Sequence, residues 1–491
     1  MSVENITTIS PKSGRPVMSR TGITSEDLHK VTTDAQTAFQ SYHTSTNLHA
    51  RQQIVARALD LLMQRKEELA YEITEQMGRP IAYSGVEIMT AVKRGRYLNE
   101  ISGGVLGGDG GVVFDNTDEK DKERASREKE GEEGEDGVRK VIKKRAVGVV
   151  LVVFGWNYPY LVLINSLIPA LLAGNAVIMK PSPQTPTVVE QIVGAFAEAG
   201  LPQNVLQYAH CGNPKLLEDL MRSPQVNHIC FTGSVAGGLA VQQAASERIV
   251  DVGLELGGKD AAYVRPDVNV AWAAAEIVDG AIFNSGQSCC AIERVYVHKD
   301  IREQFIAEVK RVLSNYRVGD PFEKDTQIGP VVSSRAKEVI QRQIDEAVKA
   351  GALDETPDDN DSFKNMPPEG NFVRPTLLTG VTHEMAVMRE ETFGPVIPVM
   401  GVDGDEEAIE LINDSEFGLS ASVWTKDVAG AEKLIERIEA GTVFINRADY
   451  PAPDLAWTGW KNSGRGVTLS QFGFDQFVKL QSYHIRECPE T

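Results

Sequence analysis

Short apolar runs alternate with helix-patterned stretches from residue 147 onward, and this alternation constrains the fold more than any other feature. Apolar runs lie at 147–154, 175–180, 205–208 and 228–231, and helical patterns lie between them at 162–173 and 187–199. Apolar strands separated by helices are typical of a parallel sheet with helices on both faces. The sequence therefore predicts an α/β fold.

A second region of the same kind follows from residue 258 to about residue 446. Its strand-like runs lie at 295–298 and 396–399, and its helical patterns lie at 301–313 and 334–350. A chain of 491 residues with 42% apolar content can bury more than one core. We therefore expect two α/β domains that meet near Glu255 and Cys289.

The stretch 103–137 interrupts the pattern. It begins Gly-rich, and residues 118–136 then hold ten acidic and five basic residues without any aromatic or branched aliphatic side chain. A segment of this composition cannot bury a core, so we expect a disordered acidic insert near 104–137. A solvated loop is the simpler interpretation, and a regulatory or partner-binding role is the alternative.

Composition argues against several partners. The net charge of -19 disfavours nonspecific binding to nucleic acid or anionic membrane. Five cysteines without a C-x-x-C pair indicate neither a disulfide framework nor a metal site, which favours a reducing, cytoplasmic location. We expect no signal peptide and no membrane span, because the N-terminus lacks an apolar core and residues 156–159 interrupt the apolar zone 147–173.

Residues 283–290 read Phe-Asn-Ser-Gly-Gln-Ser-Cys-Cys and follow an apolar helical run at 271–282. In this segment a polar turn is followed directly by the thiol of Cys289. The Asn-Ser-Gly segment predicts a loop in which backbone N–H groups converge near Cys289. A thiolate is a strong nucleophile, and such amides can hold the oxyanion formed when it attacks a carbonyl. A buried structural cysteine is the alternative, but the surrounding motifs favour a reaction centre.

Two further motifs accompany this thiol. Glu255 stands between two leucines and before two glycines, where we expect desolvation to raise its pKa toward that of a general base. Asn157 follows the apolar run 147–154 with an amide that can donate to an oxyanion. The Gly-rich turn 231–238 leaves one strand and opens a helix, a geometry that can bind phosphate but that is also common in ordinary tight turns.

Together these motifs resemble the aldehyde dehydrogenase superfamily from about residue 11 to the C-terminus. The matching segments are Asn-x-Gly-Gln-x-Cys at 284–289, Leu-Glu-Leu-Gly-Gly-Lys at 254–259, Phe-Thr-Gly-Ser at 231–234, Glu-Glu-Thr-Phe-Gly-Pro at 390–395 and Lys-Asn-Ser-Gly at 461–464. The resemblance implies a Rossmann-like cofactor domain, an α/β catalytic domain and a small β oligomerisation hairpin. The corresponding ranges are 1–102 with 147–256 for the cofactor domain, 257–460 for the catalytic domain, and 103–146 with 461–491 for the oligomerisation elements.

The same resemblance implies oxidation of an aldehyde to a carboxylic acid. Cys289 would be the nucleophile, Asn157 would hold the oxyanion and Glu255 would activate the water that hydrolyses the thioester. An acylating enzyme that uses coenzyme A is the alternative, although relatives of that type commonly lack this glutamate. A noncatalytic structural protein and an interaction hub working through the acidic insert are the alternatives outside catalysis.

The implied cofactor is NAD or NADP. Its expected contacts are Trp156, Lys180, Ser182, Gly233, Ser234, Gly238, Glu391 and Phe393. This chain has Pro183 where NAD-preferring relatives carry a glutamate, so a ribose 2′-phosphate would meet no like charge and either cofactor is acceptable. Two other departures are Gly155 before Trp-Asn and Val467-Thr468 after Gly466, and we expect activity to survive both.

The substrate is the least determined feature. Aromatic Tyr158 and Trp457 suit an apolar or extended aldehyde, while Asn165 and Asp449 make part of the expected tunnel polar. The loop 447–457 holds no clear pair of arginines for a dicarboxylic semialdehyde, and its acidic residues leave a cationic aminoaldehyde open as a substrate.

Strand-like runs at 138–145 and 477–485 resemble the oligomerisation sheet of the family, so we expect a homodimer or homotetramer.

Overall fold

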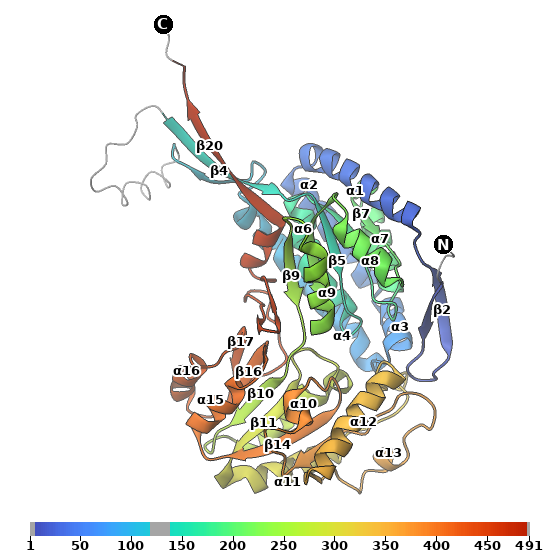
Figure 1. Ribbon diagram of the computed structural model, residues 1–491, viewed down its shortest axis with the longest axis vertical. Coiled ribbons are helices and arrows are strands. Elements are labelled where there is room, and N and C mark those ends of the chain that lie inside the picture. Colours follow the sequence, from blue (N-terminus) through green and yellow to red (C-terminus); the bar gives the residue numbers. More distant parts are fainter. Residues whose placement is uncertain (1–4, 118–137, 489–491) are drawn as a thin grey trace, which may run out of the picture.

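The fold is built on three larger sheets, and helices cover two of them (Figure 1). The computed structural model describes residues 5–117 and 138–488. The predicted insert 118–136 lies outside the described residues. Parallel strands dominate the two helix-covered sheets, which confirms the α/β class expected from the alternating pattern.

The first sheet has six strands, and all of its neighbouring strands are parallel except the first pair. Its order is β19 (Gly464–Arg465), β9 (Asp251–Glu255), β8 (Val226–Thr232), β5 (Val149–Val153), β6 (Ala176–Lys180) and β7 (Leu206–Tyr208). On one face lie α2 (Leu48–Gln64), α3 (Lys66–Met77), α4 (Ile81–Leu106), α6 (Pro159–Ala173) and α7 (Thr187–Glu198). On the other lie α1 (Ser25–Ser45), α8 (Pro214–Arg222) and α9 (Val235–Ala245).

Strand β5, in the interior of this sheet, shows why a buried strand is apolar at every position. Val150 and Val152 pack into the core under α6, whereas Val149 and Leu151 pack into the core under α1, α8 and α9. Side chains alternate between the two faces of a strand, so a strand covered on both faces must be apolar at every position. Helix α6 begins at Pro159 and ends before Gly174, whose φ of 93° suits a glycine C-cap.

The second sheet has seven strands, and only its edge strand β12 runs antiparallel to its neighbour. Its order is β12 (Leu353–Asp354), β13 (Thr376–Thr379), β14 (Val396–Val402), β11 (Ile292–His298), β10 (Asp260–Val264), β16 (Ser420–Trp424) and β17 (Thr442–Ile445). Helices α10 (Val270–Ile282) and α11 (Arg302–Leu313) cover one face. The other face packs against α12 (Ser334–Lys349), α14 (Ala386–Arg389), α15 (Asp405–Asn413) and α16 (Val428–Ile435). The short helix α13 (Asp361–Lys364) packs into the core under α10 and α11.

The third sheet is antiparallel and projects away from both helix-covered sheets (Figure 1). It contains β3 (Val112–Asp115), β4 (Val138–Ala146) and β20 (Val478–Arg486), with β4 in the centre. The register runs from Val478 opposite Ala146 to Arg486 opposite Val138. Two-stranded ribbons are formed by β1 (Asn5–Ile9) with β2 (Pro16–Thr21) and by β15 (Phe417–Gly418) with β18 (Trp460–Lys461).

Two segments differ from the sequence-based expectation. Residues 104–117, predicted to belong to the insert, form the last turn of α4, a Gly-rich turn and β3. The apolar run of this strand is only three residues long, Val112 to Phe114, between a Gly-rich stretch and the acidic segment, and its backbone pairs with β4. Residues 464–465 pair with β9 of the first sheet and not with the projecting sheet, which places Gly464 opposite Glu255.

The predicted division into cofactor, catalytic and oligomerisation ranges stays a prediction. The projecting sheet takes β3, β4 and β20 from the ranges predicted for oligomerisation, whereas β19 from those ranges pairs in the first sheet. Among the described residues, we find no helix that is both long enough and apolar enough to cross a membrane.

Candidate active site

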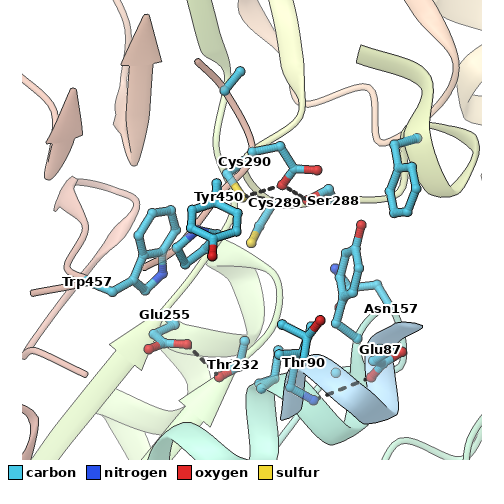
Figure 2. A pocket seen from close by; sticks show the side chains of 18 of the residues that line it. Glu87, Thr90, Asn157, Thr232, Glu255, Ser288, Cys289, Cys290, Tyr450 and Trp457 are labelled. Atoms are coloured by element: carbon cyan, nitrogen blue, oxygen red, sulfur yellow. Dashed lines mark hydrogen bonds between the residues drawn. The ribbon is translucent and has the colours of Figure 1, made fainter. Parts of the chain in front are cut away.

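A cavity of about 760 Å³ opens between the two helix-covered sheets, a volume within the range of small-molecule sites. Its wall comes from α4, α6, the end of β9, the loop after α10, residues 391–393 and the loop 446–457. Figure 2 shows Cys289, Glu255 and Asn157 around this cavity. The structure therefore brings the three expected catalytic side chains to one site, although they are far apart in the sequence.

Backbone geometry of the loop after α10 presents Cys289 to the cavity. Asn284, Ser285 and Gly286 all have left-handed backbones, with φ values of 53°, 58° and 72°. A Cβ at Gly286 would lie 2.2 Å from the carbonyl oxygen of Gly394, so only glycine fits there. The Gln287 side chain accepts from the Val332 N–H at 2.8 Å and donates to the Asn284 carbonyl at 3.1 Å. These bonds hold the loop in one shape.

The neighbouring thiol is in a different environment. Cys290 is buried, and its Sγ donates to Oδ1 of Asp449 at 2.9 Å. A hydrogen bond to Cys289, together with burial, raises the pKa of the Cys290 thiol above its usual value. Burial also raises the pKa of Asp449 to about 6. Cys290 is therefore held as a neutral thiol, while Cys289 is partly exposed on the cavity wall.

Asn157 lies against the Cys289 loop. It is buried between the end of β5 and the start of α6, and its Nδ2 donates to the Gln287 carbonyl at 3.3 Å. A side-chain amide has two N–H donors, so one remains for a ligand in the cavity.

Glu255 is the last residue of β9 and faces the cavity from the opposite side to Cys289 (Figure 2). Its carboxylate accepts hydrogen bonds from the hydroxyls of Thr232, at 3.4 Å, and of Thr468. Burial raises the pKa of Glu255 above its ordinary value, while these hydroxyls and Arg94 oppose the rise. The direction agrees with the expectation from its two flanking leucines. Thr468 occupies one of the positions where the sequence departs from the family pattern.

A buried ion pair joins the loops that carry these groups, and the sequence analysis missed it. Arg79 and Glu87 are 2% and 3% exposed and form a salt bridge. Arg79 also donates from Nε to Oδ1 of Asn284 at 3.0 Å and from Nη2 to the Asn157 carbonyl. Glu87 accepts from the Tyr160 N–H at 2.9 Å, at the start of α6. No local motif marks this network, because Arg79 meets partners 78 and 205 residues away.

Part of the cofactor set lies on the same cavity. Trp156, Gly233, Ser234, Glu391 and Phe393 line it. The Ser234 hydroxyl caps α9 by accepting from the Gly237 N–H at 3.2 Å, which leaves the other N–H groups of the first turn free for an anion. The Trp156 and Phe393 rings meet edge to face, with centroids 5.6 Å apart.

Glu391 is positioned by two glycines. Its Oε1 accepts from the Gly258 N–H at 3.2 Å, and a Cβ at Gly257 would lie 2.6 Å from its carboxylate oxygens. Burial raises the pKa of Glu391 to about 7. A buried carboxyl of this kind can bind ribose hydroxyls as an acceptor.

The other expected cofactor contacts, Lys180, Ser182 and Gly238, do not line this cavity. Lys180 ends β6 and is 9% exposed, and no hydrogen bond or ion pair to its ammonium occurs among residues 5–117 and 138–488. Burial lowers its pKa. Buried cations normally have partners, so this orphaned ammonium beside the strand ends fits the ribose or phosphate of a dinucleotide. Gly238 instead packs α9 against Leu256, where a Cβ would lie 2.6 Å from the leucine Cδ2.

A parallel sheet has an open helix N-terminus at its strand ends and meets a second α/β domain across a cavity that contains a thiol. This arrangement is typical of enzymes that bind a dinucleotide. The model of the aldehyde dehydrogenase family matches residues 1–483. This chain therefore belongs to the aldehyde dehydrogenase family and is an NAD(P)-dependent oxidoreductase of that type.

Individual relatives agree with this assignment. A lactaldehyde dehydrogenase of Escherichia coli is 34% identical over 71% of this chain and 72% of its own length. A succinate-semialdehyde dehydrogenase [NADP(+)] of Mycobacterium ulcerans is 30% identical over 97% and 99%. An NADP-dependent glyceraldehyde-3-phosphate dehydrogenase of Bacillus halodurans, solved with NADP, superposes with a TM-score of 0.89 at 30% identity, covering 98% and 96%. NAD- and NADP-dependent enzymes both occur among the similar solved structures.

The buried ion pair gives a stability prediction. Glu87→Gln leaves the Arg79 charge buried without its carboxylate, so we expect the free energy of unfolding to fall by about 3–5 kcal/mol. Urea unfolding followed by fluorescence measures the loss. Asp60→Asn breaks the Arg96–Asp60 pair, in which both side chains are more than half exposed, and should cost no more than about 1 kcal/mol. Equal losses in the two variants would contradict the structural role given to Glu87.

Proposed function

We propose that this enzyme oxidises an aldehyde to a carboxylic acid through a covalent intermediate on Cys289, with Glu255 as the general base for hydrolysis. The single observation that carries this proposal is the placement of Cys289, Asn157 and Glu255 around one cavity that also contains Trp156 and Phe393. The family membership supplies the reaction class, and the geometry supports the individual roles.

The first step is attack of the Cys289 thiolate on the aldehyde carbon, which forms a C–S bond and moves the carbonyl electron pair onto oxygen. The second N–H of the Asn157 amide and the Cys289 backbone N–H hold the resulting oxyanion. Cys290 does not compete as a nucleophile, because its raised pKa keeps it protonated.

NAD or NADP, when bound, supplies an acceptor for the hydride of the thiohemiacetal carbon, which leaves a thioester on Cys289. Glu255 then takes a proton from water, and the water oxygen attacks the thioester carbon. Breakage of the C–S bond releases the carboxylic acid and returns the thiolate. Hydrolysis is favoured over transfer to coenzyme A because this carboxyl borders the cavity and has a raised pKa suited to a base.

The proposed cofactor contacts divide into two groups. Lys180, Ser182, Gly233, Ser234 and Gly238 form or support the side of the site at the strand ends and the α9 N-terminus, which suits the adenosine and phosphates. Trp156, Glu391 and Phe393 lie on the cavity side, which suits the nicotinamide riboside. Pro183 places no carboxylate next to Lys180, so both NAD and NADP are compatible with these residues.

A homo-oligomer and a cytoplasmic location also belong to this proposal. Leu480 and Ile485 on β20 are 66% and 44% exposed in the projecting sheet, and a second subunit would cover them. The described cysteines are all free thiols, which supports a reducing compartment.

The nucleophile can be tested with adjacent substitutions. Cys289→Ala should abolish aldehyde-dependent formation of NADH or NADPH, measured by near-ultraviolet absorbance with each cofactor and no coenzyme A. Cys290→Ala is the matched control, and its turnover should stay within about tenfold of wild type, because its thiol takes no part in bond formation. Full activity of the Cys289→Ala protein, or a requirement for coenzyme A, would contradict the proposal.

The base can be tested through pH and through the acyl-enzyme. Because burial raises the pKa of Glu255, its working ionised form is lost as pH falls through that raised value, so thioester hydrolysis should slow on the acidic side. Glu255→Gln should accumulate an acyl-enzyme, detected as a mass increase on intact protein. Its rate of hydrolysis should no longer fall as the pH is lowered, so the acidic limb of the pH profile should disappear. Unchanged hydrolysis in Glu255→Gln would assign the base to another group.

The oligomer can be tested at the projecting sheet. Leu480→Asp places a charge on the proposed subunit contact, so mass photometry should show a shift from dimer or tetramer toward monomer. Leu239→Asp is a control, since Leu239 is 58% exposed on α9, which is not part of the projecting sheet. A monomeric wild-type protein would reject the proposed contact.

A further inference from the structure

Arg94 places a buried positive charge on the wall of the active-site cavity. It lies on α4, is 6% exposed and borders the same cavity as Cys289. Nη1 donates to Oδ1 of Asn165 at 2.9 Å, and Nη2 donates to the Pro451 carbonyl at 2.8 Å. Both partners are neutral. Nε is buried and has no hydrogen-bond partner among the described residues.

Acidic side chains on the cavity have other partners or face water. Glu87 pairs with Arg79, and Asp449 accepts from Ser288 and Cys290. Glu255 accepts from Thr232 and Thr468 and acts on Arg94 only through long-range attraction. Glu276 and Asp279 border the cavity from α10 but are exposed. Within residues 5–117 and 138–488, no carboxylate forms an ion pair with Arg94.

An unpaired buried guanidinium is energetically costly. Burial lowers the pKa of Arg94 to about 10, which is still far above neutral pH, so the charge is present during turnover. Buried charges are retained when an opposite charge or several hydrogen bonds compensate them. The guanidinium has five N–H donors, and neutral acceptors use two of them, so three have no hydrogen-bond partner among the described residues.

We propose that Arg94 is the anchor for a carboxylate at the far end of the substrate, so that the preferred substrates are aldehydes bearing a carboxylate. This inference rests on the proposed function, because it assigns the aldehyde end of the same molecule to Cys289. A carboxylate matches a guanidinium in charge and shape and can accept two parallel N–H bonds. The Asn165 amide beside Arg94 provides a further polar group at this end of the cavity.

Other nearby cations do not provide the same environment. Lys93 borders the cavity but is exposed, and Arg447 is exposed and stacks on the Tyr450 ring at 3.6 Å. Water screens such charges, whereas a charge in a buried site interacts strongly with its ligand. Arg94 was not predicted from the sequence, because it lies on α4, far along the chain from the loop 447–457 in which an anchoring pair of arginines would be expected.

The test compares two aldehydes of the same chain length, succinic semialdehyde and butanal. Wild-type kcat/KM should be higher for the semialdehyde, and Arg94→Met should reduce this preference about 10- to 100-fold, as expected for loss of a hydrogen bond between charged groups. Arg94→Lys, which keeps the charge, should retain more of the preference than Arg94→Met. Arg96→Met, on the exposed face of the same helix, should leave the preference unchanged.

A binding measurement separates this inference from the reaction itself. Succinate has no aldehyde, so isothermal titration calorimetry reports only carboxylate recognition. Its affinity should fall at least about tenfold in Arg94→Met and should not change in Arg96→Met. If succinate binds through Arg94 but neither aldehyde is oxidised, the proposed function fails and the carboxylate subsite stands.

Three results would overturn the carboxylate subsite while leaving the proposed function intact. The first is oxidation of both aldehydes with equal efficiency together with no succinate binding. The second is an equal loss for both aldehydes in Arg94→Met and Arg94→Lys, which would show that Arg94 only fixes the Asn165 and Pro451 contacts. The third is an unchanged preference in Arg94→Met while the acidic limb of the pH profile shifts to higher pH, which would show that Arg94 tunes Glu255 and does not bind substrate.

Discussion

The ion pair between Arg79 and Glu87 is the interaction on which the site depends. Its two side chains lie almost completely out of water, and each uses its remaining capacity to hold backbone or amide groups of the catalytic loops. Through them, α4 and the turn before it fix Asn157, the start of α6 and the left-handed turn before Cys289. A buried pair contributes little net stability compared with an apolar core, but it holds its partners in one geometry.

Burial also decides which groups in the cavity carry charge. Cys290 stays neutral beside Asp449, Glu255 has a raised pKa and Arg94 remains charged without an ionic partner. Adjacent cysteines with the same chemistry thus have different environments, because one thiol is inside the wall and the other is on its surface. The cavity wall carries both a thiol and a guanidinium, an arrangement that suits a substrate with reactive and anionic groups.

Local sequence predicted most of the fold. The strands β5, β6 and β14 and the helices α7, α10 and α12 begin and end within two or three residues of their predicted ranges, because both buried strands and amphipathic helices leave a clear period. Strand β3 was missed, since a short edge strand with partly exposed residues has no such period. The three catalytic side chains were identified from motifs, and the structure places them together, but their roles stay predictions.

The sequence by itself determined the α/β class and the loop at Cys289, because both depend on neighbouring residues: apolar periodicity and the Asn-Ser-Gly turn. Only the tertiary structure decided which charges are paired. Arg94 meets Asn165 and Pro451 across 71 and 357 residues, and Arg79 meets Asn284 across 205. Burial and pairing of a charge depend on everything packed around it, so the electrostatics of the cavity could not be read from any local motif.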